Sequence, residues 1–79
     1  MINLLHIAIA RDAEFLFLEP DGEGYIIVVT RIQGKIDIRR FYWDEDQERY
    51  RPTSKAIRLT LNSVKRIVDG LLIEVLGES

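Results

Sequence analysis

The chain has 79 residues, which corresponds to a single domain (residues 1–79). A domain of this size buries only about 60–65% of the surface of its unfolded chain, so a partner subunit would help to stabilise it. No cysteine and only one histidine are present, which excludes disulfides, thiolate metal sites and a histidine-rich metal centre, and we expect no cofactor. The net charge is −2, and the sequence lacks both a basic signal-peptide start and the ~18 apolar residues of a membrane span. We expect a soluble intracellular protein, in a bacterial cytoplasm or a nucleus, with no membrane partner.

The first half of the chain contains four predicted β-strands. Residues 2–10 (INLLHIAIA) are apolar and partly alternating, and a tight reversal separates them from 15–18 (FLFL). A segment rich in Gly and Pro precedes the β-branched run 25–32 (YIIVVTRI). The glycine of RIQGK (31–35) suits a hairpin turn, so the alternating segment 36–43 is expected to pair with 25–32.

The second half is predicted to contain a loop, a short strand and a helix. Residues 44–54 (DEDQERYRPTS) are polar and charged and include a proline, which predicts a long mobile loop before a short strand at 56–59 (AIRL). Thr60 is a suitable N-cap for an amphipathic helix of about four turns. Its apolar stripe is formed by Val64, Ile67, Val68, Leu71, Leu72 and Val75.

These elements predict an α+β fold, an antiparallel sheet of four to five strands followed by one C-terminal helix, in which sheet and helix bury each other. The helix nevertheless has more apolar surface than one sheet can cover. Ile73 lies opposite the main stripe, and Leu76 lies partway round the helix. A second copy of the helix would cover this surface, so we expect a dimer.

Charge is distributed unevenly along the chain. Residues 31–66 contain ten basic and five acidic residues, whereas the remainder contains one basic and eight acidic residues. Such asymmetry indicates a surface for a polyanion on an otherwise acidic body, although a solvated face of mixed charge is the commoner explanation.

Catalysis has little support in the sequence. His6 lies in an apolar segment without a serine, cysteine or acidic partner nearby, so we interpret it as a structural residue. The acidic residues of 44–48 lack the spacing, the central glycine and the final glutamate of a calcium-binding loop. We predict a non-enzymatic protein.

Basic and aromatic residues interleave between residues 31 and 58. Single-stranded nucleic acid exposes phosphates and the flat faces of bases, so a surface that binds it needs cations and stacking groups. Tyr42, Trp43 and Tyr50 could supply the stacking. At least one of Phe41 and Trp43, which share one face of a strand, is expected in the core. Duplex DNA is served less well, because no helix-turn-helix is visible.

Residues 34–60 also show a specific ordered pattern. Gly34-Lys35 forms a predicted hairpin, followed by Asp-Ile-Arg (37–39), two aromatics (41–42) and Asp44. A polar loop with Pro52, then Lys55, Ile-Arg-Leu (57–59) and Thr60 before a helix complete the pattern. In this order the segment resembles the core of the positive cofactor four family of transcriptional coactivators, which are small dimeric proteins that bind single-stranded DNA. The similarity covers about half of the chain, from about residue 28 to residue 67.

The resemblance implies a dimer whose paired sheets form a basic and aromatic groove for two antiparallel single strands, with the C-terminal helices packed across the dimer. It implies that Lys35 contacts phosphate at the hairpin, that Arg39 is the strand arginine, that Tyr42 stacks on a base, and that Lys55 is the basic residue after the loop.

The sequence departs from the family pattern at several places. Ile32 stands where the family has a stacking aromatic, and Gln33 where it has a lysine, which implies weaker binding at that end. The segment 35–37 is about two residues shorter, which preserves the alternation of faces, and Ala56 replaces a glycine. The segment 2–10 has no clear counterpart.

We therefore predict a homodimer that binds single-stranded DNA, with RNA as an open alternative, and acts in transcription regulation or in DNA repair and replication. The predicted nucleic-acid-binding residues are Arg31, Ile32, Lys35, Arg39, Tyr42, Trp43, Arg51 and Lys55. The alternative is a protein-interaction module that docks on the transcription machinery through a sheet edge or through residues 2–10.

Strand alternation conflicts with one part of this prediction. It places Arg39, Phe41 and Trp43 on one face and Arg40 and Tyr42 on the other, whereas the resemblance assigns Arg39 and Tyr42 to the same bound strand. A bulge, a twist or a ligand that wraps an edge would reconcile the two. We expect Tyr42 to face outward and Phe41 inward, and the sequence leaves Trp43 undecided.

Overall fold

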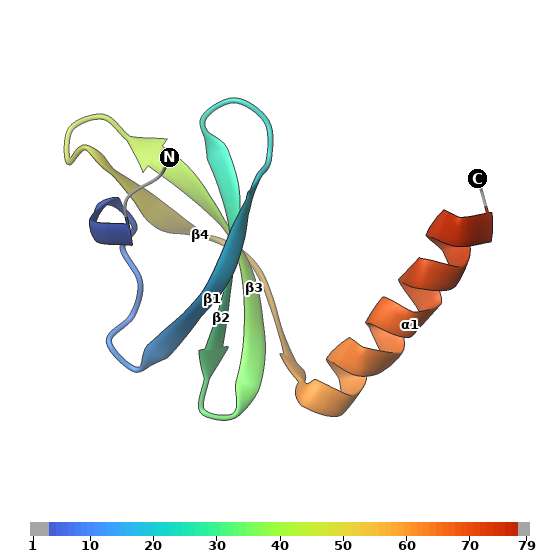
Figure 1. Cartoon of the computed structure of the whole chain (residues 1–79). Helices are drawn as coiled ribbons and strands as arrows, with labels where there is room; N and C mark the ends of the chain where they lie inside the picture. The colour runs from blue at the N-terminus through green and yellow to red at the C-terminus, as the bar shows by residue number, and fades with distance from the viewer. Residues whose placement is uncertain (1–3, 78–79) are drawn as a thin grey trace.

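The computed structural model describes residues 4–77. Its elements are a 3₁₀ turn η1 (Leu4–His6), strands β1 (Ala13–Pro20), β2 (Tyr25–Ile32), β3 (Lys35–Asp44) and β4 (Arg49–Thr60), and helix α1 (Leu61–Gly77). The four strands form one antiparallel sheet in the order β1-β2-β3-β4, so each strand pairs with its neighbour in the chain (Figure 1). The predicted α+β class, with a four-stranded antiparallel sheet followed by a C-terminal helix, is confirmed.

The hairpin between β2 and β3 is the tightest connection of the sheet. Ile32 pairs with Lys35, so only two residues form the turn. Gln33 and Gly34 both have positive φ, 51° and 76°, which gives the turn a twist that matches that of the flanking strands. Glycine adopts this conformation without steric cost, as the predicted hairpin required.

The segment before β1 differs from its prediction. Residues 2–10 were expected to form a strand, but η1 occupies Leu4–His6, and residues 7–12, here called the strap, are mostly irregular; residues 2 and 3 lie outside the described residues. A single bridge joins Ile7 to Tyr50, and the Ala8 N–H donates to the Tyr50 carbonyl at 2.9 Å. Within this apolar run Ile7 is buried against the sheet and Ile9 packs beside it, which requires no pairing beyond this one bridge, whereas Leu5 stays exposed.

Strand β4 is longer than predicted. The loop expected at 44–54 is limited to the turn at 45–48, and Arg49 already pairs with Asp44. Pro52 is tolerated because β4 is an edge strand and its missing N–H removes no necessary hydrogen bond. The register shifts between the partners of Arg39 and Phe41, and the Thr53 hydroxyl there donates to the Arg40 carbonyl at 2.7 Å.

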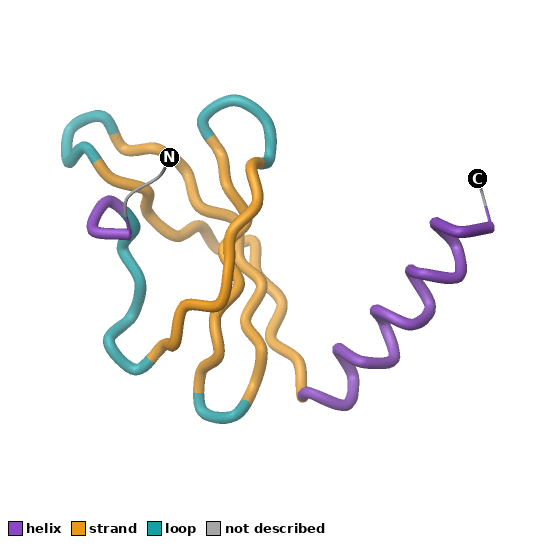
Figure 2. The backbone as a smooth tube through the Cα atoms, in the orientation of Figure 1, coloured by secondary structure: helices purple, strands orange, loops and turns teal. Residues whose placement is uncertain are grey.

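Helix α1 begins as predicted but does not pack as predicted. The Ser63 N–H donates to the Thr60 hydroxyl oxygen at 3.2 Å, which confirms the N-cap. Beyond its first turns the helix extends away from the sheet, as the purple tube in Figure 2 shows, and none of its residues is buried. The expectation that sheet and helix bury each other is therefore wrong for one chain. Most of the apolar stripe is exposed. The reason is that α1 follows the end of β4 and projects away from the sheet (Figure 1).

The two faces of the sheet have different surroundings. The core face carries Ile26, Val28 and Phe41, which form a buried cluster with Ile7 of the strap; Ile9, Phe15, Leu18 and Tyr50 pack around this cluster. The opposite face, here called the open face, carries Tyr25, Val29 and Ile38 and their neighbours in register. No helix within residues 4–77 is both long enough and apolar enough to cross a bilayer.

Candidate nucleic-acid interface

One end of the open face presents an aromatic row. Tyr25 of β2 pairs with Tyr42 of β3, which in turn pairs with Arg51 of β4, so the three side chains lie side by side on one face. Tyr25 and Tyr42 are 38% and 37% exposed. Two neighbouring phenol rings with accessible surface can stack on flat ligands.

Arg40 extends the aromatic row towards the middle of the sheet. Its guanidinium lies 3.7 Å from the centroid of the Tyr25 ring, which is a cation–π contact, and its Nε lies 2.9 Å from a carboxylate oxygen of Asp21. Arg40 is therefore held over the ring of Tyr25 by the cation–π contact and by the carboxylate of Asp21. The planar guanidinium is itself a stacking surface for bases.

The middle of the open face is apolar. Val29, Ile38 and Ile57 form the row across β2, β3 and β4, and Phe17 of β1 lies beside Val29. Val29 is buried, whereas Phe17 and Ile57 remain 54% and 50% exposed. Accessible apolar surface therefore continues from the aromatic row along the sheet.

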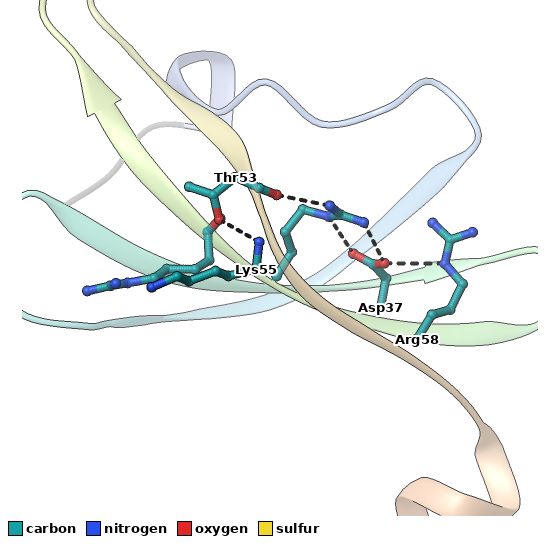
Figure 3. Close-up of polar contacts among 6 residues, drawn as sticks. Asp37, Thr53, Lys55 and Arg58 are labelled. Carbon is teal, nitrogen blue, oxygen red and sulfur yellow. Dashed lines mark hydrogen bonds and ion pairs between the residues drawn. The ribbon is translucent and has the colours of Figure 1, made fainter.

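Lys55 adds a cation at the β4 edge. It precedes Ala56, which pairs with Arg39 of the core face, so Lys55 projects towards the open face. In Figure 3 its side chain lies on the other side of β4 from Asp37. Lys55 forms no ion pair with any residue of 4–77, which leaves its ammonium group available for phosphate.

Three other cations of the open face are paired with acids around its edge. Arg31 lies 3.7 Å from Glu14 of β1, and Arg51 lies 3.3 Å from Asp44 at the end of β3. With the Arg40–Asp21 pair, three of its arginines have a carboxylate partner. The positive potential of this face is therefore weaker than its number of basic residues indicates.

Asp44 also closes the turn between β3 and β4. Partial desolvation raises its pKa, but hydrogen bonds from the N–H groups of Gln47 and Asp46 and from Arg51 outweigh this effect, so the pKa of Asp44 lies below its ordinary value. The carboxylate thus stays ionised at neutral pH and fixes both the turn and Arg51.

The predicted site residues divide between the two faces. Arg31, Tyr42, Arg51 and Lys55 lie on the open face, whereas Ile32, Lys35, Arg39 and Trp43 lie on the side of the core face. The register shift beside Arg39 concerns its pairing with β4, and β3 stays regular against β2. Arg39 and Tyr42 consequently remain on opposite faces, and the conflict noted in the sequence is real.

Several residues on the core-face side are committed to internal contacts. Ile32 is buried, and Arg39 donates to both carboxylate oxygens of Asp37 at 3.2 Å. Phe41 is buried and Tyr42 exposed, which confirms the expected inward and outward positions. Trp43 is 37% exposed and makes an edge-to-face contact with Tyr50, with ring centroids 5.0 Å apart.

Arg40 and Tyr25 belong to the open face but were not among the predicted nucleic-acid-binding residues. Arg40 could have been found from strand alternation alone, which places it on the face of Tyr42. Tyr25 could have been found from the two-residue hairpin, because a turn at Gln33–Gly34 that pairs Ile32 with Lys35 also places Tyr25 opposite Tyr42.

Comparison with known proteins assigns neither a family nor a function to the chain. The chain matches no protein-family model, no curated protein and no solved structure. Among residues 4–77, no three histidine, cysteine, aspartate or glutamate side chains are grouped so that they could hold a metal ion.

Proposed function

We propose that the protein is a non-enzymatic homodimer that binds single-stranded nucleic acid on the open face of its sheet. The observation that carries this proposal is the aromatic row, in which Tyr25 and Tyr42 lie in register with Arg40 stacked on one of the rings. Exposed rings beside cations suit unpaired bases joined by phosphates, and each stacked base contributes roughly 1–3 kcal/mol.

The same geometry favours single strands over duplexes. Bases in a duplex are stacked on each other, so their flat faces are not available to Tyr25 and Tyr42. A shallow apolar surface that runs from the aromatic row past Phe17 and Ile57 suits splayed bases, while Lys55 at the edge suits a phosphate. Single-stranded DNA is the proposed ligand, and single-stranded RNA is the alternative ligand of the same class.

Helix α1 is the proposed dimer contact. Large apolar side chains along it are about half or more exposed: Leu61, Ile67, Val68, Leu71, Leu72, Ile73, Val75 and Leu76. Monomeric proteins rarely expose a continuous apolar surface of this kind. A second copy is chemically matched to it, because the helix is its own apolar complement in a two-fold arrangement.

Light scattering tests the dimer, with Leu71→Glu as the disrupting variant and Lys65→Glu as a control on the same helix. A two-fold contact would bury Leu71 of both copies, so the substitution should weaken association by about 3–6 kcal/mol, twice the value of one buried leucine. A monomeric parent protein at micromolar concentration would refute the dimer.

The proposed biological setting is transcription regulation or DNA repair and replication inside a bacterial cytoplasm or a nucleus, in line with the resemblance of residues 34–60 to the positive cofactor four family. One observation favours a second candidate, a protein-interaction module on the transcription machinery. The pairs Arg31–Glu14, Arg40–Asp21 and Arg51–Asp44 reduce the attraction of the open face for a polyanion.

Fluorescence anisotropy with labelled oligo(dT) separates the two candidates. The proposed function predicts submicromolar binding at low salt that weakens with added salt, because released counterions contribute to affinity. A duplex of equal length is the control and should bind more weakly. Absence of binding at low salt would support the protein-interaction module instead.

A further inference from the structure

A hollow lies between the strap and the core face, away from the open face. The strap runs from the contact of Ile7 with Tyr50 of β4 to the start of β1. The side chain of Ile7 fills the space between the first part of the strap and the core face. Ala8 and Ala10 of the strap also line this space, and their side chains are too small to fill the rest. A hollow of about 210 Å³ remains and is partly open to solvent.

The walls of the hollow are largely apolar. Ile9 of the strap, Val28 and Ile32 of β2, Phe41 of β3 and Pro52 of β4 contribute to its lining. Such walls favour a ligand with a hydrocarbon or ring body. The volume is below the roughly 300 Å³ at which sites for drug-sized ligands begin, so the ligand is small.

A charged triad borders the same hollow. The buried carboxylate of Asp37 receives two hydrogen bonds from Arg39 and one from Arg58, at 3.2, 3.2 and 3.3 Å (Figure 3). Two guanidinium groups face one carboxylate, so the triad carries one excess positive charge. A single excess charge suits a monoanion.

The two arginines differ in their remaining hydrogen-bonding capacity. Arg39 uses its third nitrogen to donate to the Thr53 carbonyl at 3.0 Å. Arg58 donates only through Nε, and its two terminal nitrogens have no partner among residues 4–77. Two terminal N–H groups in a plane match the two oxygens of a carboxylate. Arg58 is therefore the anion-binding group of the triad.

We infer that this hollow binds a small amphipathic carboxylate, whose apolar body lies between the strap and β2–β3 and whose carboxylate pairs with the terminal nitrogens of Arg58. The site is independent of the proposed nucleic-acid surface, because Tyr25 and Tyr42 lie on the opposite face of the sheet. Failure of one inference therefore leaves the other standing.

Hexanoate is a suitable probe, and backbone-amide NMR of the full chain is a suitable measurement. A ligand of eight non-hydrogen atoms is expected to bind with a dissociation constant on the order of 1 mM. Saturable shifts should occur at residues 8–10, at Ala13 and at Arg58. Acetate lacks the apolar body and 1-hexanol lacks the charge, so each should bind at least tenfold more weakly.

Two variants and one control identify the contacts. Arg58→Gln should weaken hexanoate at least tenfold, while Arg39 continues to satisfy Asp37; Arg66→Gln on α1 is the matched control and should change nothing. Ala8→Leu fills the hollow and should abolish binding with Arg58 intact, and a dispersed amide spectrum verifies that each variant is folded. The inference is overturned if hexanoate causes no saturable shifts, if acetate or 1-hexanol binds equally well, or if Arg58→Gln binds like the parent.

Discussion

The core face and the open face of the sheet are made by the same strands but have different surroundings. Phe41 and Tyr42 are neighbours on β3, yet Phe41 is buried under the strap and Tyr42 is 37% exposed. The core face has an internal partner in Ile7, whereas the open face keeps Phe17, Tyr25 and Ile57 accessible. Because the chain itself buries only one face, the apolar and aromatic residues of the other face stay available for contacts with another molecule, which is the basis of the proposed function.

The largest effect of a point change within the sheet is expected at Phe41. Phe41→Ala should destabilise the fold by about 3–5 kcal/mol, since it removes a ring from the buried cluster and leaves a cavity. Urea unfolding measures this. Tyr42→Ala is the matched control on the adjacent position and should cost much less stability. Equal losses at both positions would remove the distinction between the two faces.

The reverse pattern is expected for ligand binding. Tyr42→Ala should weaken oligo(dT) by about 1–3 kcal/mol through loss of a stacked base, whereas Tyr42→Phe should retain most of the affinity. Anisotropy titrations of both variants and of Lys55→Ala provide the measurement. If Tyr42→Ala and Lys55→Ala both bind like the parent protein, the open face is not the ligand surface.

A smaller effect, of opposite sign, is expected from the acids at the edge of the open face. Asp21→Asn frees Arg40 from its carboxylate partner and should strengthen oligo(dT) binding by about 0–1 kcal/mol, the usual range for an exposed ion pair. The salt dependence should steepen, because one more phosphate contact adds about 0.7 to the slope for single strands. Asp12→Asn, in the strap, is the charge-matched control. Weaker binding by Asp21→Asn than by this control would contradict the prediction, because it would show that the Asp21 carboxylate favours binding and does not compete with the ligand for Arg40.

The smallest effect concerns the turn that presents Arg51. The pKa of Asp44 is lowered in the folded chain, so its ionised form contributes stability above its ordinary pKa of about 3.8, and this contribution is lost as the pH falls through the lower folded value. Asp44→Asn should therefore be less stable than the parent at pH 7, and the difference should disappear in strong acid. Thermal unfolding between pH 7 and pH 2 measures this. A difference that persists unchanged at pH 2 would contradict the role of the carboxylate.

Local sequence patterns predicted much of the fold. The β-branched run predicted β2, the two-residue turn predicted the β2–β3 hairpin, and Thr60 predicted the start of α1. These three features were predictable because each is decided by residues close in sequence. The strap and the first half of β4 were missed because distant contacts decide them. Ile7 is placed by Phe41 and Val28, and a charged segment that reads as a loop becomes a strand because β3 offers it an edge.

The candidate site, like the fold, was predicted only in part. Tyr42, Arg51 and Lys55 were assigned from residue type and from the family resemblance, and the structure brings them to one face with Tyr25. Arg39 shows the limit of such an assignment. A strand arginine looks available in a sequence, but whether it faces phosphate or a buried Asp37 depends on which face the rest of the chain covers.

Amide NMR mapping of oligo(dT) on the labelled protein tests the central claim most directly, because it reports both faces in one experiment. We predict saturable shifts centred on Tyr25, Arg40, Tyr42, Arg51 and Lys55, with little change at Ile7, Val28 and Phe41. Shifts centred on the strap and the core face, or no shifts at low salt, would contradict the assignment of the open face as the nucleic-acid surface.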